Sequence, residues 1–478
     1  MEPIRLRLPE GCGDATVRAA VAGARFLTVD SRVVPAKFAV AGGDLVCLRS
    51  APVGGRVELP WPVDGFGVVT VSTATVPVTD EPPDLVTELA RGTLGPLRDR
   101  LGAWEVAGWR PSAAVRGEVS AARRAFVAAA VGEKAGSPAA ALSAVFGAGL
   151  TVAAAYGATA RAYRDIDVVE RQASGGEAPA ASEEAVSVGD SRADTVIIGD
   201  GSGGPSSSGR AGHAVATPWA VVEPRRGERR WDVVEDALAE AAAEGRAITC
   251  GPLVDFRDGA LPFWLERLAD RPNELASLVA DYVESYIGRF GVVVRQWEVV
   301  AAVESGPAKP FADDLRLALT GLALKSAHGI AGERPLTLRV AEPDGRHLVD
   351  PAHRATPFDF IDHLLRGGVP LSSLTLDFTG RDFVVAGGGD DGSGVVRDSP
   401  IDLLRTVDAW RRFDLPLRVA VDASAGEREQ SVGDGGAESR ATIVETLRRC
   451  AGVACVELDR SSAAEVTRPG GAQEARMS

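Results

Sequence analysis

Acidic side chains at or just past the ends of predicted strands are the residues of this chain best suited to chemistry. Two carboxyl groups at one site, one protonated and one ionised, can act as a general acid and as a nucleophile or base. In a barrel of parallel strands these groups must lie where the strands end, because the loops there build the pocket. The candidates are Asp255, Glu304, Glu342, Asp377, Asp422 and Asp459.

Metal, thiol and serine chemistry have weaker support. The five histidines show no H-x-x-x-H or H-E-x-x-H spacing, and the five cysteines are not in metal-ligand spacing. No G-x-S-x-G elbow occurs in the chain. We therefore expect no metal and no cofactor, and we expect the cysteines to be buried free thiols in a reducing compartment.

Composition and charge exclude several classes of partner. The chain has 478 residues, 45% of them hydrophobic, and a formal net charge of −14. Nucleic acid and anionic membranes bind basic surfaces, so neither is an expected partner. The N-terminus has no continuous apolar run of the signal-peptide kind, and no run approaches 18 apolar residues. The sequence therefore predicts no membrane span and a cytoplasmic location.

Changes of pattern divide the chain into several regions. The first alternates like short β-strands, the second has a helical period and is rich in alanine, and the third is almost free of large apolar residues. The first region is either a carbohydrate-binding module or a structural cap. The predicted regions are a β-rich, sandwich-like module at 1–83, a helical spacer at 84–171, a disordered linker at 172–194 and a barrel at 195–478.

The last region alternates strands and helices. Strands are predicted at 195–199, 213–218, 247–254, 293–301, 336–342, 371–378, 416–422 and 453–458. Thr356 and Ser399 begin helices as N-caps, each followed by proline and then by an acid at the third helical position. This pattern predicts a (β/α)8 barrel, a TIM barrel. The alternative is an open doubly wound sheet, which is less favoured because no glycine-rich phosphate loop leads from the first strand into a helix.

Short motifs in this last region resemble the glycoside hydrolase family 10, the xylanase family, over about residues 213–425. The motifs are V-V-E-P-R-R-G at 221–227 followed by Trp231, G-P-L-V at 251–254 followed by L-P-F-W at 261–264, W-E-V-V at 297–300, G-V-P at 368–370 and L-P-L-R-V at 415–419. Their order and spacing are those of the family. The resemblance implies a barrel that acts on or binds β-linked saccharides, so a carbohydrate is the expected partner.

The positions that carry catalysis in the family are substituted here. The resemblance puts Ala302 at the acid/base position and Val421 at the nucleophile position, with Asp422 one residue further on. The family's lysine after the second strand falls at Pro218, and its histidine after the third strand falls at Pro252. The packing residues of the family remain, whereas the polar groups that would hold the reacting sugar are replaced.

Three hypotheses follow. The first is a xylanase-like pseudoenzyme that binds or scaffolds on a saccharide. The second is an active O-glycosyl hydrolase with relocated carboxylates, Glu304 and Asp422, and the third is unrelated barrel chemistry. Glu304 would share the face of Ala302 if the strand extended that far. The residues expected to bind substrate are Asp255, Trp264, Trp297 and Asp377, although core packing is the alternative role of the tryptophans.

Overall fold

The structure is a computed structural model that describes most of the chain. It covers residues 3–29, 31–50, 52–132, 136–173, 195–199, 212–243, 245, 247–307, 310–349, 355–384, 396–422, 447 and 453–459. The surroundings of side chains are described for all of these except 158–173, 195–199, 212–213, 349, 422 and 453–459. The linker predicted at 172–194 lies outside the described residues from 174 onward.

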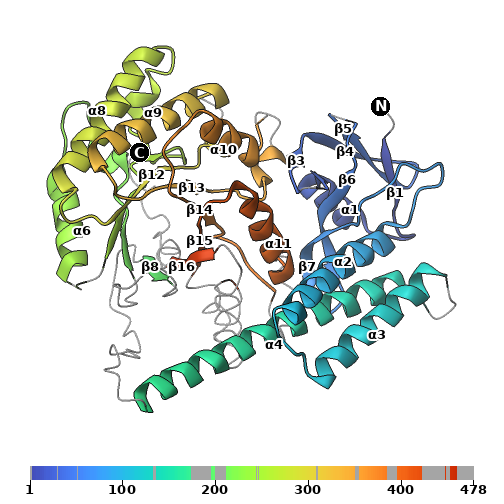
Figure 1. The fold of residues 1–478 in the computed structure, drawn as a ribbon. Helices are drawn as coiled ribbons and strands as arrows, with labels where there is room; N and C mark the ends of the chain where they lie inside the picture. Colours follow the sequence, from blue (N-terminus) through green and yellow to red (C-terminus); the bar gives the residue numbers. More distant parts are fainter. Residues whose placement is uncertain are drawn as a thin grey trace, which may run out of the picture.

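Two antiparallel sheets and one helix form the N-terminal module (Figure 1), as the predicted fold class requires. Burial alternates along its first strand, where Ile4 and Leu6 are buried and Arg5 and Arg7 are exposed, because successive side chains point to opposite faces. The first sheet has the order β1 (Ile4–Arg7), β5 (Asp44–Arg49), β4 (Ala36–Ala41); the second has the order β3 (Val33–Val34), β2 (Arg25–Thr28), β6 (Gly55–Val63), β7 (Gly67–Ser72); helix α1 spans Asp14–Gly23.

Three helices follow the module where the sequence predicts them. They are α2 (Leu85–Val106), α3 (Ala113–Ala130) and α4 (Pro138–Ala173). The Asp84 carboxylate begins α2 by accepting a hydrogen bond from the Thr87 backbone N–H at 2.7 Å. Leu85 and Leu89 at the start of α2 pack in the core of the module, whereas Leu97, further along it, packs in the core that includes the barrel. Helix α2 therefore belongs to both hydrophobic cores.

One described stretch, Pro138–Gly157 of α4, is long and apolar enough to cross a membrane by length and composition alone. Its mean hydropathy is 1.6, and 56% of it is buried inside the structure. Helix α4 packs against α2 and α3, and the Tyr156 ring stacks on Trp104 with ring centroids 3.7 Å apart. Packing of this kind is typical of a core helix and accounts for the apolar composition.

The strands of the last region close into a barrel. Parallel pairing runs from β9 through β10, β12, β13, β14 and β15 to β16, with β11 continuing the position of β10 beside β12. The strands are β8 (Thr195–Gly199), β9 (Gly212–Val215), β10 (Ile248–Cys250), β11 (Val254–Asp255), β12 (Gln296–Ala301), β13 (Leu336–Val340), β14 (Ser373–Asp377), β15 (Leu417–Asp422) and β16 (Val453–Asp459). A strand lies at every predicted position, so the barrel prediction is confirmed.

One strand departs from the predicted all-parallel pattern. Strand β8 pairs antiparallel with both β16 and β9 and completes the circle between them. Because antiparallel neighbours can be joined by a hairpin, β8 and β9 need no crossover helix between them, whereas parallel neighbours do.

Helices surround the parallel strands (Figure 1). They are α5 (Trp219–Val222), α6 (Trp231–Ala243), α7 (Phe263–Glu266), α8 (Pro272–Phe290), α9 (Asp313–Ala331), α10 (Pro357–Arg366) and α11 (Pro400–Trp410), with short 3-10 turns η1 (Arg346–Val349) and η2 (Arg411–Phe413). Thr356 and Asp359 form the capping box expected at α10, and the Ser399 hydroxyl accepts a hydrogen bond from the Ile401 N–H at the start of α11.

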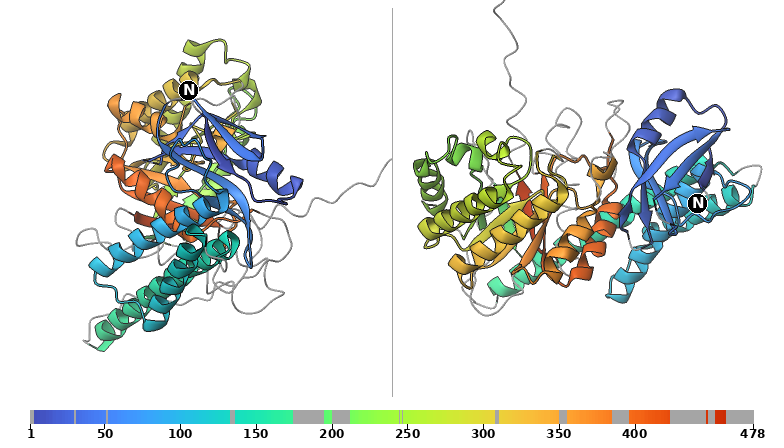
Figure 2. Two further views of the ribbon diagram at one scale, coloured as in Figure 1. Left: turned by 90° about the vertical axis from the view of Figure 1, so that its right-hand side faces the viewer. Right: turned by 90° about the horizontal axis from the view of Figure 1, so that it is seen from above.

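The module lies beside the barrel, and α4 runs beneath both (Figures 1 and 2), while α2 also contacts α11 and α3 packs on α4 and α2. The loop that follows β14 reaches the module through its backbone. The Thr70 N–H of β7 donates to the Arg397 carbonyl at 2.8 Å, and the Arg397 N–H donates to the Val68 carbonyl at 3.0 Å. Strand β7 thus gains backbone partners from the barrel. The boundaries at 83, 171 and 194 stay predictions.

Candidate functional site

A chain of ion pairs fills the interior of the barrel near the ends of the strands. Arg339 of β13 donates from Nε to Glu298 Oε1 of β12 at 2.6 Å, and its Nη1 lies 3.3 Å from Asp377 Oδ2 at the end of β14. Arg257, just past β11, contacts Asp255 Oδ2 at 2.8 Å and lies 3.8 Å from Asp377 Oδ2. Charged groups from several strands therefore meet at the end of the barrel where active sites of this fold are built.

Strand alternation explains which residues face this interior. In β13, Thr337 and Arg339 alternate with leucines that pack in the hydrophobic core. Thr375 of β14 donates to Glu298 Oε2 at 3.3 Å, reaching past β13 to β12. The pairing of β12 with β13 shifts by one residue between Glu298 and Val300. This bulge brings Ala301 opposite Arg339, so beyond Glu298 the strand turns small side chains toward the interior.

A second polar layer lies deeper in the barrel. Arg418 of β15 donates to Gln296 Oε1 of β12 at 2.7 Å, although two strands separate β15 from β12 in the sheet. Gln296 Nε2 donates to Thr337 Oγ1 at 2.6 Å, and Thr337 shares a hydrogen bond of 2.7 Å with the Ser373 hydroxyl. Hydrogen bonds across the interior satisfy buried polar groups that would otherwise cost free energy.

The arginines keep Asp377 ionised. Burial alone would raise the pKa of this carboxyl group, but Arg339, the Thr379 hydroxyl and N–H, and Arg257 outweigh burial and hold the pKa below its usual range. Burial would likewise lower the pKa of Arg257, and the carboxylates of Asp255 and Asp377 raise it instead. Asp377 can therefore accept hydrogen bonds and balance charge, but it is a poor proton donor near neutral pH.

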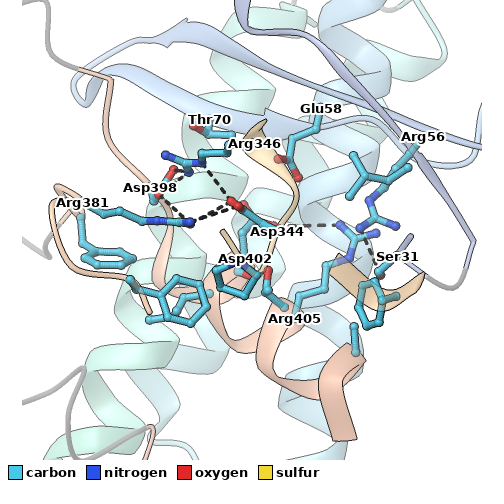
Figure 3. Close-up of a pocket in the computed structure, with 18 residues that line it drawn as sticks. Ser31, Arg56, Glu58, Thr70, Asp344, Arg346, Arg381, Asp398, Asp402 and Arg405 are labelled. Carbon is cyan, nitrogen blue, oxygen red and sulfur yellow. Dashed lines mark hydrogen bonds and ion pairs between the residues drawn. The ribbon is translucent and has the colours of Figure 1, made fainter. Parts of the chain in front are cut away.

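A second charged cluster lies where the loops after β13 and β14 meet the module (Figure 3). Arg381 contacts both oxygens of Asp344, at 2.8 and 3.0 Å, and Arg346 Nε contacts Asp344 Oδ2 at 2.9 Å. Arg25 of β2 donates from Nη1 to the Asp344 carbonyl at 2.9 Å, and Arg346 also pairs with Asp398. Burial would raise the pKa of Asp344, but these three arginines hold it well below its usual range.

A pocket opens beside this cluster. It encloses about 550 Å³, including space open to solvent, and residues of the module and the barrel both line it. Two carboxyl groups of the barrel in this region have raised pKa values. Burial, reinforced by Glu58, raises the pKa of Asp402 to about 7. Burial, reinforced by Asp344, raises the pKa of Glu342 to about 7 as well.

No family model and no curated protein matches the chain. Among solved structures it is similar to xylanase B from Clostridium stercorarium F9 (13% identity, TM-score 0.34, 44% of this chain and 63% of that one). It is also similar to a family 10 xylanase of Thermobacillus composti (13%, 0.33, 44% and 60%) and to xylanase 10B from Thermotoga maritima (15%, 0.38, 52% and 74%). The chain spans less than two thirds of the length of the first two, and the likeness is divergent and partial.

Of the residues predicted to bind substrate, the structure brings Asp255 and Asp377 together through Arg257. Trp264 lies apart from them on α7, half-buried, where its Nε1 donates to the Glu223 carbonyl at 3.0 Å. Trp297 is fully buried and its ring meets Tyr286 edge-on, on the side of β12 that packs against α8. Its indole therefore packs in the core and offers no face to the barrel interior.

The two residues predicted to be catalytic lie apart in the chain. Asp422 is the last residue of β15, and its side chain is outside the described part of the chain. Strand β12 ends at Ala301, and Ala302 adopts a left-handed φ of 55°, so the strand does not extend to Glu304. The condition for Glu304 to share the face of Ala302 is not met, because the chain turns there.

Glu304 is enclosed in the loop that follows β12. Only 1% of the residue is exposed, and Oε1 accepts hydrogen bonds from the Glu342 N–H at 2.8 Å and the Ser305 hydroxyl at 3.2 Å. Burial raises the pKa of this carboxyl group, against the effect of these hydrogen bonds. Arg316, also fully buried, donates to the Val303 carbonyl at 2.7 Å and so holds the same loop. Glu304 is thus a protonatable group inside a loop and not at an open cleft.

Sequence reasoning missed the arginines that organise both clusters. Arg339 and Arg418 stand at alternate positions in strands whose other alternate residues are leucine and valine, which was a signal that they face the interior. Asp344 and Arg381 carried no such signal, since they lie in loops. Among the residues that the structure describes, no group of three or more His, Cys, Asp or Glu side chains could hold a metal ion.

The raised pKa of Asp402 predicts a loss of stability with rising pH. A carboxyl group whose pKa is higher in the folded than in the unfolded state makes its full contribution to stability at pH values below the unfolded-state pKa. That contribution is lost as the pH rises from the unfolded-state pKa through the folded-state pKa. For Asp402 the window runs from 3.8 to about 7. Its side chain is 29% exposed, so we expect a partial effect, about 1–2 kcal/mol between pH 5 and pH 8.

Urea unfolding followed by tryptophan fluorescence measures this effect. The wild-type free energy of unfolding should fall from pH 5 to pH 8, and Asp402→Asn should remove a large part of the fall. Glu342 contributes in the same direction, so some slope remains in the variant. An identical pH dependence in the variant and the wild type would contradict the assignment.

Proposed function

We propose that this chain is a family-10-like barrel that binds a β-linked oligosaccharide or polysaccharide without cleaving it. The observation that carries the proposal is the neutralisation of the carboxylates in the barrel mouth. Retaining cleavage needs one carboxyl group that can donate a proton beside one that is free to attack the sugar. Asp255 and Asp377 are both ion-paired with Arg257, and Asp377 is also paired with Arg339.

Glu304 does not restore the missing acid. Its raised pKa suits a proton donor, but its Oε1 is occupied by the Glu342 N–H and the Ser305 hydroxyl. With 1% of the residue exposed, a saccharide could reach it only if the loop opened. These observations support binding in place of hydrolysis.

The saccharide ligand is inferred from the order of the sequence motifs between 221 and 419. A binding surface of suitable chemistry lies on α7, which follows β11 at the C-terminal end of the strands. There Phe263 is 67% exposed, and the Arg267 guanidinium lies 4.9 Å from its ring centroid. Aromatic faces combined with hydrogen-bond donors are common in ligand sites, and Trp264 adds a second, half-buried ring next to it.

The test of this function has two arms, each using the full chain. In the first, turnover of an aryl β-xyloside and release of reducing ends from xylan should equal the buffer blank. In the second, the protein should be retarded in a gel that contains soluble xylan. Phe263→Ala should abolish the retardation, whereas Val292→Ala, an exposed residue before β12 at the opposite end of the barrel, should not change it. No retardation of the wild type by any β-linked glucan or xylan would refute saccharide binding.

The second candidate is an active glycosyl hydrolase with relocated carboxylates. One observation favours it: Glu342 and Asp344 are neighbours whose pKa values are pushed apart, to about 7 and well below the usual range. Such a divergence is a common property of acid and base pairs. However, three arginines bind the Asp344 carboxylate or surround it, which leaves it poorly placed to attack a sugar. Xyloside turnover that is lost in Glu342→Gln would establish this candidate.

A further inference from the structure

Two arginines, one from the module and one from the barrel, converge in the pocket between them (Figure 3). Arg56 of β6 is 5% exposed, and its hydrogen bonds go to neutral groups, the Thr28 carbonyl at 3.2 Å and the Ser31 hydroxyl at 3.2 Å. Its Nε is buried without a hydrogen-bond partner in the described chain. Arg405 of α11 likewise has a buried Nη1 without a hydrogen-bond partner there.

The two guanidinium groups are close enough to affect each other. Burial, followed by the proximity of Arg405, lowers the pKa of Arg56 to about 10. Two like charges in a partly buried site repel one another and also lose hydration, so the arrangement is costly unless a negative charge lies between them.

The carboxylates nearby are largely engaged elsewhere. Glu58 pairs with Arg25, and Asp344 pairs with Arg346 and Arg381. Asp398 also pairs with Arg346 and lies 3.8 Å from Arg381. The nearest carboxylate to Arg405 is Asp402, whose Oδ1 lies 4.0 Å away, beyond hydrogen-bond distance. The Arg56–Arg405 end of the pocket therefore carries donors and positive charge in excess of its acceptors.

We propose that this end of the pocket binds a small oxyanion, a sulfate, phosphate or carboxylate group, that bridges Arg56 of the module and Arg405 of the barrel. Guanidinium groups present planar pairs of N–H donors that match the oxygens of such ions. The Ser31 hydroxyl, whose oxygen accepts a hydrogen bond from Arg56, also lines the pocket and can donate to such an ion. The two arginines come from β6 and α11 and not from the barrel strands, and the proposal does not depend on saccharide binding.

Isothermal titration calorimetry on the full chain tests the site, with ionic strength held constant by sodium chloride. The probes are sulfate, inorganic phosphate and glucuronate. Saturable 1:1 binding of at least one probe is expected. A preference for the inorganic ions indicates a phosphate-type ligand, and a preference for glucuronate indicates the carboxylate of an acidic sugar. The absence of saturable binding by all three would overturn the proposal, whatever the outcome with xylan.

Substitutions test whether the ion binds at Arg56 and Arg405. Arg56→Gln and Arg405→Gln should each weaken binding about ten-fold or more, because each removes a charge-assisted hydrogen bond of about 1.5–3 kcal/mol. Above pH 7, where Asp402 is ionised, Asp402→Asn should tighten binding, since it removes a competing negative charge. Arg366→Gln, on the exposed surface of α10, is the matched control and should bind as the wild type does. Arg405 is less buried than Arg56, so Arg405→Gln decides the question if Arg56→Gln fails to fold. Undiminished binding in Arg405→Gln would also overturn the proposal.

Discussion

Arg339→Ala is expected to lower the free energy of unfolding by about 3–5 kcal/mol. Arg339 is the cation that joins Glu298 and Asp377 in the interior of the barrel, and both carboxylates are almost fully buried. Removing it takes the shared cation away from two buried carboxylates, of which Asp377 keeps Arg257 at 3.8 Å and Glu298 keeps the Thr375 hydroxyl at 3.3 Å. The loss of stability arises mainly from the buried carboxylates that lose their cation, because the net contribution of an intact buried ion pair is small.

Urea denaturation followed by tryptophan fluorescence measures this loss. Arg334→Ala is the matched control: Arg334 is exposed just before β13 and donates only to the Ala331 carbonyl, at 3.4 Å, in the described structure. Its replacement should change the free energy by no more than about 0.5 kcal/mol. A decrease in the free energy of unfolding below about 1 kcal/mol in Arg339→Ala would mean that water or a rearrangement stabilises the two carboxylates in place of Arg339. The ion pairs in the barrel interior would then not be needed for stability.

The second large effect is expected at the surface between module and barrel. Asp344→Ala removes the carboxylate that Arg346 and Arg381 share and that Arg25 approaches to 3.4 Å. The guanidinium groups then repel one another, with Glu342, Asp398 and Glu58 left as the nearest counter-charges. We expect the free energy of unfolding to fall by about 3–5 kcal/mol. We also expect the module to separate from the barrel first at the contact that Arg25 makes.

Two measurements separate detachment from global unfolding. Limited proteolysis at low urea should cut the variant sooner than the wild type, and the urea midpoint should fall. Asp362→Ala serves as the control, because Asp362 is half exposed on α10 and pairs with Arg366 one helical turn away. If Asp344→Ala and Asp362→Ala behave alike, the cluster does not hold the module.

The positions of strands and helices could be predicted because they depend on local pattern. The leucines of β13 and the β-branched residues of β12 follow the period of a strand, and Thr356 with Asp359 has the spacing of a capping box. The face of β12 beyond Glu298 could not be predicted, because the bulge that shifts its pairing leaves no mark in the amino-acid types. The predicted strand end at 301 agrees with the structure, so the strand does not extend to Glu304 and the condition for Glu304 to share the face of Ala302 is not met.

The ion-paired clusters depend on long-range pairing, which alternation does not reveal. Arg25 and Asp344 are 319 residues apart, and Arg418 reaches Gln296 across the interior of the barrel. A strand pattern shows that Arg339 or Arg418 faces inward but not which carboxylate or amide it meets. Asp255 and Asp377 were selected because they lie near strand ends, and their common partner Arg257 follows only from the closed barrel.

The direction of β8 changes what the rim of this barrel is made of. Thr195, where β8 begins, pairs with Asp459 at the end of β16, so β8 brings its first residue to the rim at which the parallel strands finish. The parallel strands run toward that rim, whereas β8 starts at the rim and runs away from it. One sector of the mouth is therefore built from the start of a strand in place of a strand's end.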